Sequence, residues 1–320
     1  MSRTAHFKLG LFIYCLFALV SITLLLFAGG FTTSIKAGMA FLDWPLSNGS
    51  INPEGWLSET DKFAEHSHRL LGMQIGLIAI GLVLWTFLRE ARAWVRTLAW
   101  ALLGLVIFQG LLGGARVLFD QLNTQAESNL LAQFFLVAHA SGAMIVLTLL
   151  VSITLACSRS WIEGRWTMPE GTALAGLKRW ALIAYGATFI QIFIGAVMRH
   201  ADAGLAIARF PLANEYSLIP AYWNFPVAIH FAHRVGAVFL TGLLLWLCVH
   251  LWRFRGLDRL FARFSSVIVG ILSLQIYLGA LTIWTAKNPY SATIHHLVGA
   301  FLLASVWGIA FILNRNPESE

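Results

Sequence analysis

The chain has 320 residues, of which 58% are hydrophobic and only 12% are charged, and its formal net charge is +7. This composition excludes an ordinary soluble domain, because apolar runs of ~20 residues recur and each can span ~30 Å of hydrocarbon. Basic residues that flank these runs account for the positive charge, so it does not indicate a nucleic-acid partner.

The hydropathy pattern predicts an all-α integral membrane protein with eight membrane-spanning helices. The expected spans are 9–31, 68–88, 98–119, 130–157, 180–198, 227–252, 264–285 and 292–313. The first run is too long for the apolar part of a typical signal peptide, and no clear small-residue cleavage site follows it. We therefore expect it to remain in the protein as a helix.

Basic residues predict the orientation in the membrane, because they gather in alternate connections. Those on the expected cytoplasmic side are Arg3, Lys8, Arg89, Arg92, Arg96, Arg159, Arg165, Lys178, Arg179, Arg253, Arg255, Arg259, Arg263 and Arg315. The positive-inside rule then puts both termini in the cytoplasm. We expect a multi-pass protein of the cell inner (plasma) membrane.

An internal repeat is the most informative feature of the sequence. The segments that match are 29–45 with 195–211, 109–113 with 275–279, and 139–143 with 296–300. Repeats of this kind predict structural units that recur in the fold. We expect two repeated four-helix bundles in parallel topology, an N-terminal half (1–157) and a C-terminal half (180–320), joined by a cytoplasmic linker at 158–179.

The three cysteines, Cys15, Cys157 and Cys248, fall within or at the ends of the expected helices. None lies in an outer loop, so no disulfide is expected on the outer face. We interpret them as small packing residues rather than metal ligands.

Four histidines take related positions in the repeat: His68, His139, His233 and His296. Each half supplies one from each of its two even-numbered helices, and all four should lie in the outer part of the membrane. A single buried histidine often only joins helices by a hydrogen bond. Two that face inward from neighbouring helices can hold a haem iron by both axial positions. We expect these four to be haem ligands.

The neighbours of these histidines add to the prediction. Arg69 and Arg234 each follow a histidine and are candidates for binding haem propionates, since a guanidinium group binds carboxylates through two hydrogen bonds. His295 adjoins His296 but points ~100° away on a helix. Only one of the two should face the site, and the repeat selects His296.

Glu65 distinguishes the two halves chemically, because its counterpart in the repeat is His230. Glu65 lies three residues before His68, so the two side chains share one helix face. A carboxylate there can accept a proton or stabilise a positive charge on a bound substrate. The alternative is a simple ion pair with Arg69, four residues further along the helix.

With these motifs the sequence resembles the heme A synthase family over roughly residues 9–313. The resemblance rests on the eight-helix repeat and on short motifs, namely Glu65-x-x-His68-Arg69, His139, His233-Arg234, His296, the loop 38–46 and the segment 279–282. Two departures stand out. Outer-loop positions where many members carry paired cysteines read Phe41, Ser47, Ile207 and Ala213, and the usual arginine after the first helix is missing from 31–34.

The resemblance implies oxidation of a methyl group of haem O to the formyl group of haem A, for a terminal oxidase. It implies a haem b cofactor between His233 and His296, and a substrate haem between His68 and His139. Glu65 matches the essential acidic position of the family. A haem O synthase and a membrane electron acceptor are the partners that the resemblance implies.

Two other functions remain open at the level of sequence: a two-haem b-type membrane electron carrier, and a haem-binding or haem-sensing membrane protein without chemistry of its own. Glu65 favours the enzyme, because an electron carrier needs no acid there. We also expect the more permanent haem in the C-terminal half. Its outer connection at Asn288-Pro289 is shorter than the corresponding connection 120–129, which leaves less room for a haem to enter.

Overall fold

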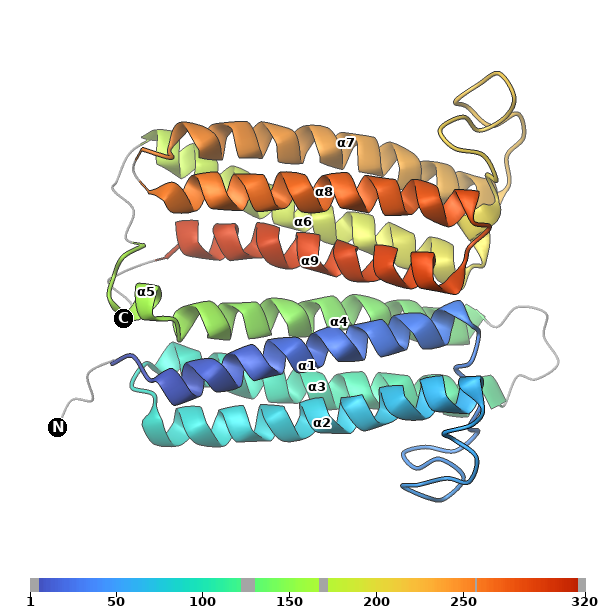
Figure 1. Cartoon of the computed structure of the whole chain (residues 1–320), viewed down its shortest axis with the longest axis horizontal. Coiled ribbons are helices and arrows are strands. Elements are labelled where there is room, and N and C mark those ends of the chain that lie inside the picture. The colour runs from blue at the N-terminus through green and yellow to red at the C-terminus, as the bar shows by residue number, and fades with distance from the viewer. Residues whose placement is uncertain (1–5, 122–129, 167–171, 257, 316–320) are drawn as a thin grey trace.

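The computed structural model describes residues 6–121, 130–166, 172–256 and 258–315. These residues form helices and connecting loops, with no strand among them. Eight long helices run side by side along the length of the molecule (Figure 1). Each is long and apolar enough to cross a membrane. The prediction of an all-α protein with eight membrane-spanning helices is therefore confirmed.

The long helices are numbered in chain order together with one short helix, α5, and one 3-10 turn, η1. They are α1 (Leu9–Ser34), α2 (Thr60–Arg89), α3 (Ala93–Gln121), α4 (Leu130–Ala156), α5 (Arg159–Ile162), α6 (Thr172–His200), η1 (Ala203–Leu205), α7 (Phe225–Arg253), α8 (Arg259–Trp284) and α9 (Pro289–Leu313). Most extend beyond the expected spans, because hydropathy marks only the part that is apolar enough for lipid. One consequence matters for the site: Glu65 and His68 lie inside α2, which begins at Thr60.

The segment predicted as a plain linker contains ordered structure. Helix α5 lies there, and the side chain of Trp161 is buried, with its ring 4.9 Å from that of Phe311 and 6.0 Å from that of Trp94. These contacts tie the connection to the ends of α3 and α9. Aromatic residues in an otherwise polar linker were the sequence signal for this packing.

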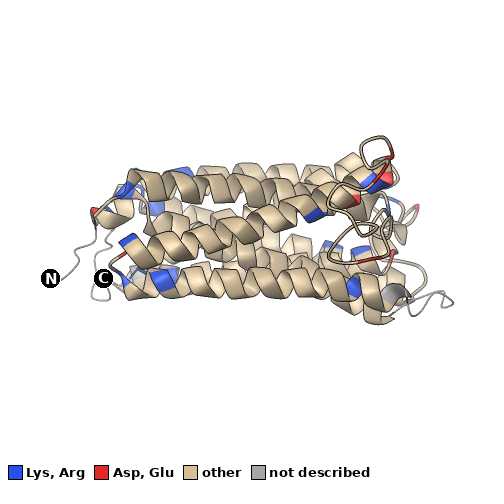
Figure 2. Ribbon diagram, turned by 90° about the horizontal axis from the view of Figure 1, so that it is seen from below, with Lys and Arg blue, Asp and Glu red and all other residues tan. Residues whose placement is uncertain are grey.

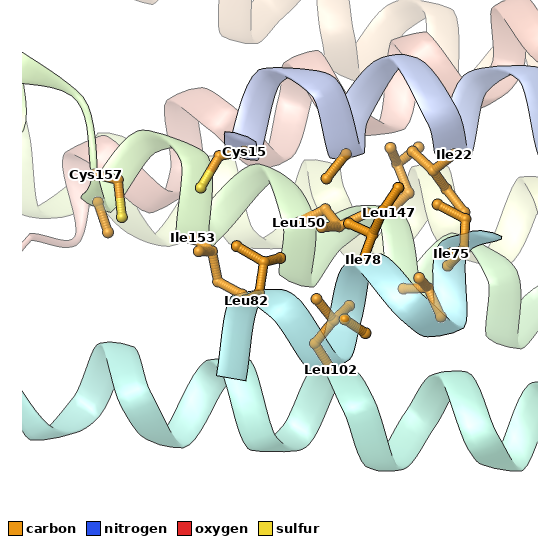
Figure 3. Close-up of a cluster of buried hydrophobic side chains, with 14 of the residues drawn as sticks. Cys15, Ile22, Ile75, Ile78, Leu82, Leu102, Leu147, Leu150, Ile153 and Cys157 are labelled. Atoms are coloured by element: carbon orange, nitrogen blue, oxygen red, sulfur yellow. The ribbon is translucent and has the colours of Figure 1, made fainter. Parts of the chain in front are cut away.

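Figure 1 shows the helices in two groups, α1–α4 and α6–α9. Each group has its own core of buried aliphatic side chains, and Figure 3 shows that of the first, with Leu82, Leu102 and Leu150 from three different helices. The groups meet where α1 packs on α9, α4 on α6, and α4 on α9. The first two contacts are equivalent in the repeat, so the groups are arranged about an approximate two-fold axis.

The cysteines are buried and free, as expected for packing residues. Cys15 and Cys157 lie in the core of the first group, toward the end where α1 begins (Figure 3). No disulfide forms between cysteines of the described residues, all three of which are internal to the helical body.

Charged residues gather near the two ends of the bundle and are scarce between them (Figure 2). At the end where α1 begins, a buried ion pair joins Arg92 and Glu90, with 2.8 Å between Nε and Oε1 and 3% of each side chain exposed. Arg92 also donates to the Ala156 carbonyl at 2.9 Å, which links the α2–α3 turn to α4. Burial alone raises the pKa of Glu90, but the hydrogen bonds and charge of Arg92 lower it below its usual value.

At the opposite end, a lysine and an aspartate join the two groups of helices. Lys36 and Asp202 occupy equivalent places in the repeat, and their side chains form an ion pair at 3.2 Å. Lys287 contacts the other carboxylate oxygen of Asp202 at 2.6 Å. The hydrogen bond from Lys287, with a further one from Lys36, holds the pKa of Asp202 below its usual value.

Candidate haem sites

His68 of α2 and His139 of α4 face each other inside the N-terminal group. Their ring centroids are 6.2 Å apart and their planes are nearly perpendicular, at 86°. Two metal–nitrogen bonds of ~2 Å, with the ~1 Å from each nitrogen to its ring centre, give about the same separation. The pair therefore fits an iron between the two imidazoles.

Glycines of neighbouring helices lie against the two rings, at positions where a side chain would approach the imidazole closely. A Cβ built on Gly29 would lie 2.7 Å from Cε1 of His68, and one on Gly113 would lie 3.5 Å from Cε1 of His139. His139 is also oriented from behind, because its Nδ1 lies 3.1 Å from the Gln109 carbonyl oxygen. A carbonyl at Nδ1 fixes the tautomer that leaves Nε2 free to bind a metal.

His68 and its counterpart His233 differ in how they are held. Nδ1 of His68 is buried, and no side chain of the described residues forms a hydrogen bond with it; the backbone of Leu25 is its neighbour. Nδ1 of His233 lies 3.1 Å from the Gln191 side-chain amide, which also donates to the His233 carbonyl at 2.8 Å. Gly195 packs on His233 as Gly29 packs on His68, with a Cβ position 3.0 Å from Cε1.

The two adjacent histidines of α9 point in different directions. Nδ1 of His295 lies 3.2 Å from the carbonyl oxygen of Gln275 on α8. His296 instead turns toward the N-terminal group, where a Cβ on Gly30 would lie 3.3 Å from its Cδ2. The structure thus does not bring His296 together with His233 in the way that it brings His139 together with His68.

The guanidinium groups of Arg69 and Arg234 bind the loops that follow α1 and α6. Arg69 donates to the carbonyls of Phe41, Asp43 and Leu46, and Arg234 to those of Ile207, Arg209 and Leu212, which are the equivalent residues of the repeat. Each arginine therefore clamps the loop that follows the first helix of its group. The expectation that the two arginines bind haem propionates stays a prediction.

Glu65 and His230 anchor the same point of these loops. The Phe41 N–H donates to Oε2 of Glu65 at 3.1 Å, and the Ile207 N–H donates to Nδ1 of His230 at 3.3 Å. Glu65 also forms the ion pair with Arg69, at 2.5 Å between Nη2 and Oε1, with only 5% of its side chain exposed. The ion pair with Arg69, which the sequence suggested as the alternative role of Glu65, is thus present, and it is buried.

Arg199 was not singled out by the sequence, although it connects the two groups. Its Nη2 donates to the Gly30 carbonyl at 2.5 Å and to Ser34 Oγ at 2.8 Å, both on α1. Ser34 Oγ in turn lies 3.0 Å from Oγ1 of Thr293 on α9, a side chain with no exposed surface. A basic residue at the outer end of an apolar helix was the available signal.

The match to a known protein family covers nearly the whole chain, including the residues of the candidate sites. The profile of the family COX15-CtaA, described as "Cytochrome oxidase assembly protein", matches residues 12–307. A protein named "Heme A synthase" from Alkalihalophilus pseudofirmus is 28% identical over 95% of this chain and 97% of the relative. Another of that name from Halalkalibacterium halodurans is 29% identical over 93% and 95%. The chain belongs to the COX15-CtaA family of cytochrome oxidase assembly proteins.

Proposed function

We propose that this protein is a membrane oxidoreductase that oxidises a methyl group of haem O to the formyl group of haem A, for assembly of a terminal oxidase. The observation that carries the proposal is the facing pair His68 and His139, in a chain whose relatives are named heme A synthase. Its setting supports the proposal, because the pair lies in an all-helical membrane body suited to an apolar macrocycle.

In this proposal His68 and His139 hold the substrate, haem O. A haem b is held in the C-terminal group by His233 together with a histidine of α9, and when bound it supplies redox chemistry. The Gln191 side chain at Nδ1 of His233 fixes the orientation of the ring, and with its amide oxygen turned toward Nδ1–H it would support a permanent haem, since such outer acceptors strengthen metal binding. His68 lacks this contact, which suits a ligand that must release its product.

Glu65 is assigned the role of the acidic group at the substrate site. It lies one helix turn before His68, and Arg69 and the Phe41 N–H hold its carboxylate in place. Oxidising a methyl group releases protons, and a fixed carboxylate can accept one or position the water that supplies oxygen. The electrons leave to a membrane electron acceptor, and a haem O synthase supplies the substrate.

The proposal also covers location. Basic residues such as Arg89, Arg159 and Arg259 lie at the ends of helices where α1 begins and α9 ends (Figures 1 and 2). By the positive-inside rule that end faces the cytoplasm of a cell whose plasma membrane contains the protein. The haem sites then lie toward the outer surface.

The test is to express the full chain in cells that make haem O and to identify the extracted haems by chromatography. Wild type should yield haem A or a hydroxylated haem O intermediate. Glu65→Gln should keep both haem spectra, because glutamine still accepts from the Phe41 N–H, and should lower haem A yield by ~10² or more. The matched control is His230→Gln, which should keep measurable haem A formation.

Two results would overturn the proposal. Haem b alone in the wild-type extract, with reversible reduction of two haems, would support an electron carrier. A normal haem A yield from Glu65→Gln would reduce that residue to a partner of Arg69 in the loop clamp.

A further inference from the structure

Helix α9 carries two histidines in succession, and only one of them repeats the backbone contact of His139, although the Gln275 side-chain nitrogen also lies 3.4 Å from Nε2 of His295. The carbonyl of Gln109 on α3 lies 3.1 Å from Nδ1 of His139, and the carbonyl of Gln275 on α8 lies 3.2 Å from Nδ1 of His295. Gln109 and Gln275 are equivalent in the internal repeat. The same backbone acceptor thus orients one imidazole in each half.

The glycines one turn further along α3 and α8 give the same correspondence. A Cβ on Gly113 would lie 3.5 Å from Cε1 of His139, and a Cβ on Gly279 would lie 3.1 Å from Cε1 of His295. Both imidazoles therefore pack edge-on against a helix that has no side chain at that position. His296 makes neither contact.

The surroundings of the two rings point the same way. His295 is close enough to His233 to interact with it electrostatically, as His68 is with His139. The electrostatic neighbours of His296 are Arg199, which also acts on His295, together with His200 and His295 itself, and they do not include His233. Its ring also lies against Gly30, beside the Ser34–Thr293 contact between the two groups of helices.

We infer that His295, paired with His233, is the α9 ligand of the haem iron in the C-terminal group, and that His296 belongs to the interface between the two groups. The shift by one residue concerns the histidines alone, because Gly142 and Gly299, each three residues after His139 and His296, lie against the equivalent side chains of Gln109 and Gln275. Moving one residue along a helix turns the side chain by ~100°.

The test reads iron ligation in the full chain, with each variant made in the wild-type protein and in a His139→Ala background. In that background the N-terminal haem cannot have two protein imidazole ligands, so the low-spin spectrum reports the C-terminal haem. His295→Ala should lose the low-spin spectrum of an iron with two imidazole ligands, and added imidazole should restore it in the protein that keeps His139. His295→Met should keep a six-coordinate iron and raise its reduction potential, because a methionine–histidine pair favours the reduced iron.

The matched controls are His296→Ala and His296→Met, which should keep the wild-type low-spin spectrum and potential. Loss of the low-spin spectrum in His296→Ala but not in His295→Ala would overturn the assignment. A raised reduction potential in His296→Met, together with an unchanged potential in His295→Met, would also overturn it. This comparison of methionine variants tests the assignment even if an alanine variant does not fold. The inference rests on the proposed function only in requiring a bound haem, so absence of haem A formation would leave it standing.

Discussion

The two groups of helices share one scaffold and differ in the buried polar side chain that anchors the loop after the first helix of each group. In each, an arginine clamps three carbonyls of the outer loop, and a buried polar side chain holds an N–H of the same loop. That polar side chain is a carboxylate, Glu65, in one group and an imidazole, His230, in the other. The repeat therefore preserves loop anchoring, and the groups differ in the charge of this anchor and in the side-chain contacts of His68 and His233.

The largest expected effect comes from removing the arginines. Arg69→Leu leaves the Glu65 carboxylate buried and unpaired, and breaking a buried ion pair in this way costs ~3–5 kcal/mol. Arg234→Leu leaves only carbonyls without donors, at ~1–3 kcal/mol. Thermal unfolding of the purified variants in detergent should therefore rank Arg69→Leu as the less stable. Equal losses would mean that the Glu65 charge adds nothing to the clamp.

A second prediction concerns the end where α1 begins, where the buried Glu90–Arg92 pair contrasts with the exposed residues Arg255 and Gly256 that follow α7. The pKa of Glu90 is lowered in the folded protein, so the pair stabilises the fold above the unfolded carboxyl pKa of ~4.3 and is lost as pH falls through the folded value. Unfolding measured between neutral and acid pH should show this loss. Glu90→Gln should be less stable at neutral pH and should lose less on acidification.

The third prediction exchanges the side chains of Gln191, which contacts His233, and of its counterpart in the N-terminal group. Leu25 is the counterpart of Gln191 in the repeat. Gln191→Leu should weaken haem binding in the C-terminal group by ~10–100-fold, the usual effect of losing such a contact. Leu25→Gln should strengthen retention in the N-terminal group and slow release of product. Haem titration of each variant measures both effects, and no change in either would remove the argument for a permanent C-terminal haem.

The smallest effect is expected at the exposed contact between Lys36 and Asp202. Breaking it with Lys36→Met should cost less than ~1 kcal/mol, since exposed ion pairs contribute little. Because the pKa of Asp202 is lowered, the contribution is present above the unfolded carboxyl pKa and disappears as pH falls through the folded one. Unfolding of wild type and Lys36→Met should therefore converge at acid pH, and a difference that persists there would have another source.

Much of the fold was predictable because lipid imposes length and apolarity on each span. The eight helices follow from this constraint, whereas the expected four-helix repeat and the pairing of His68 with His139 came from the internal repeat of the sequence. What hydropathy does not contain is the exact residue at which a helix starts. The first residues of α2 and α9 therefore escaped prediction, and so did which of His295 and His296 lies against the Gln275 carbonyl.

The roles of Arg69 and Arg234 show a second limit of the sequence. An arginine beside a haem-facing histidine suggests a carboxylate partner, and sequence alone offers no alternative acceptor. The structure supplies six loop carbonyls, three for each arginine, from residues about 25 positions away. Backbone acceptors carry no sequence signature, because every residue has one.

The contact between Lys36 and Asp202 bears on ancestry. The two residues are the same position of the repeat, so in a homodimer of identical halves that position would meet its own copy across the axis, and any charge there would repel itself. Joining the halves in one polypeptide allows the two copies to diverge, here to opposite signs. The attraction then favours association of unlike halves over like ones, a preference that no symmetric ancestor could have encoded.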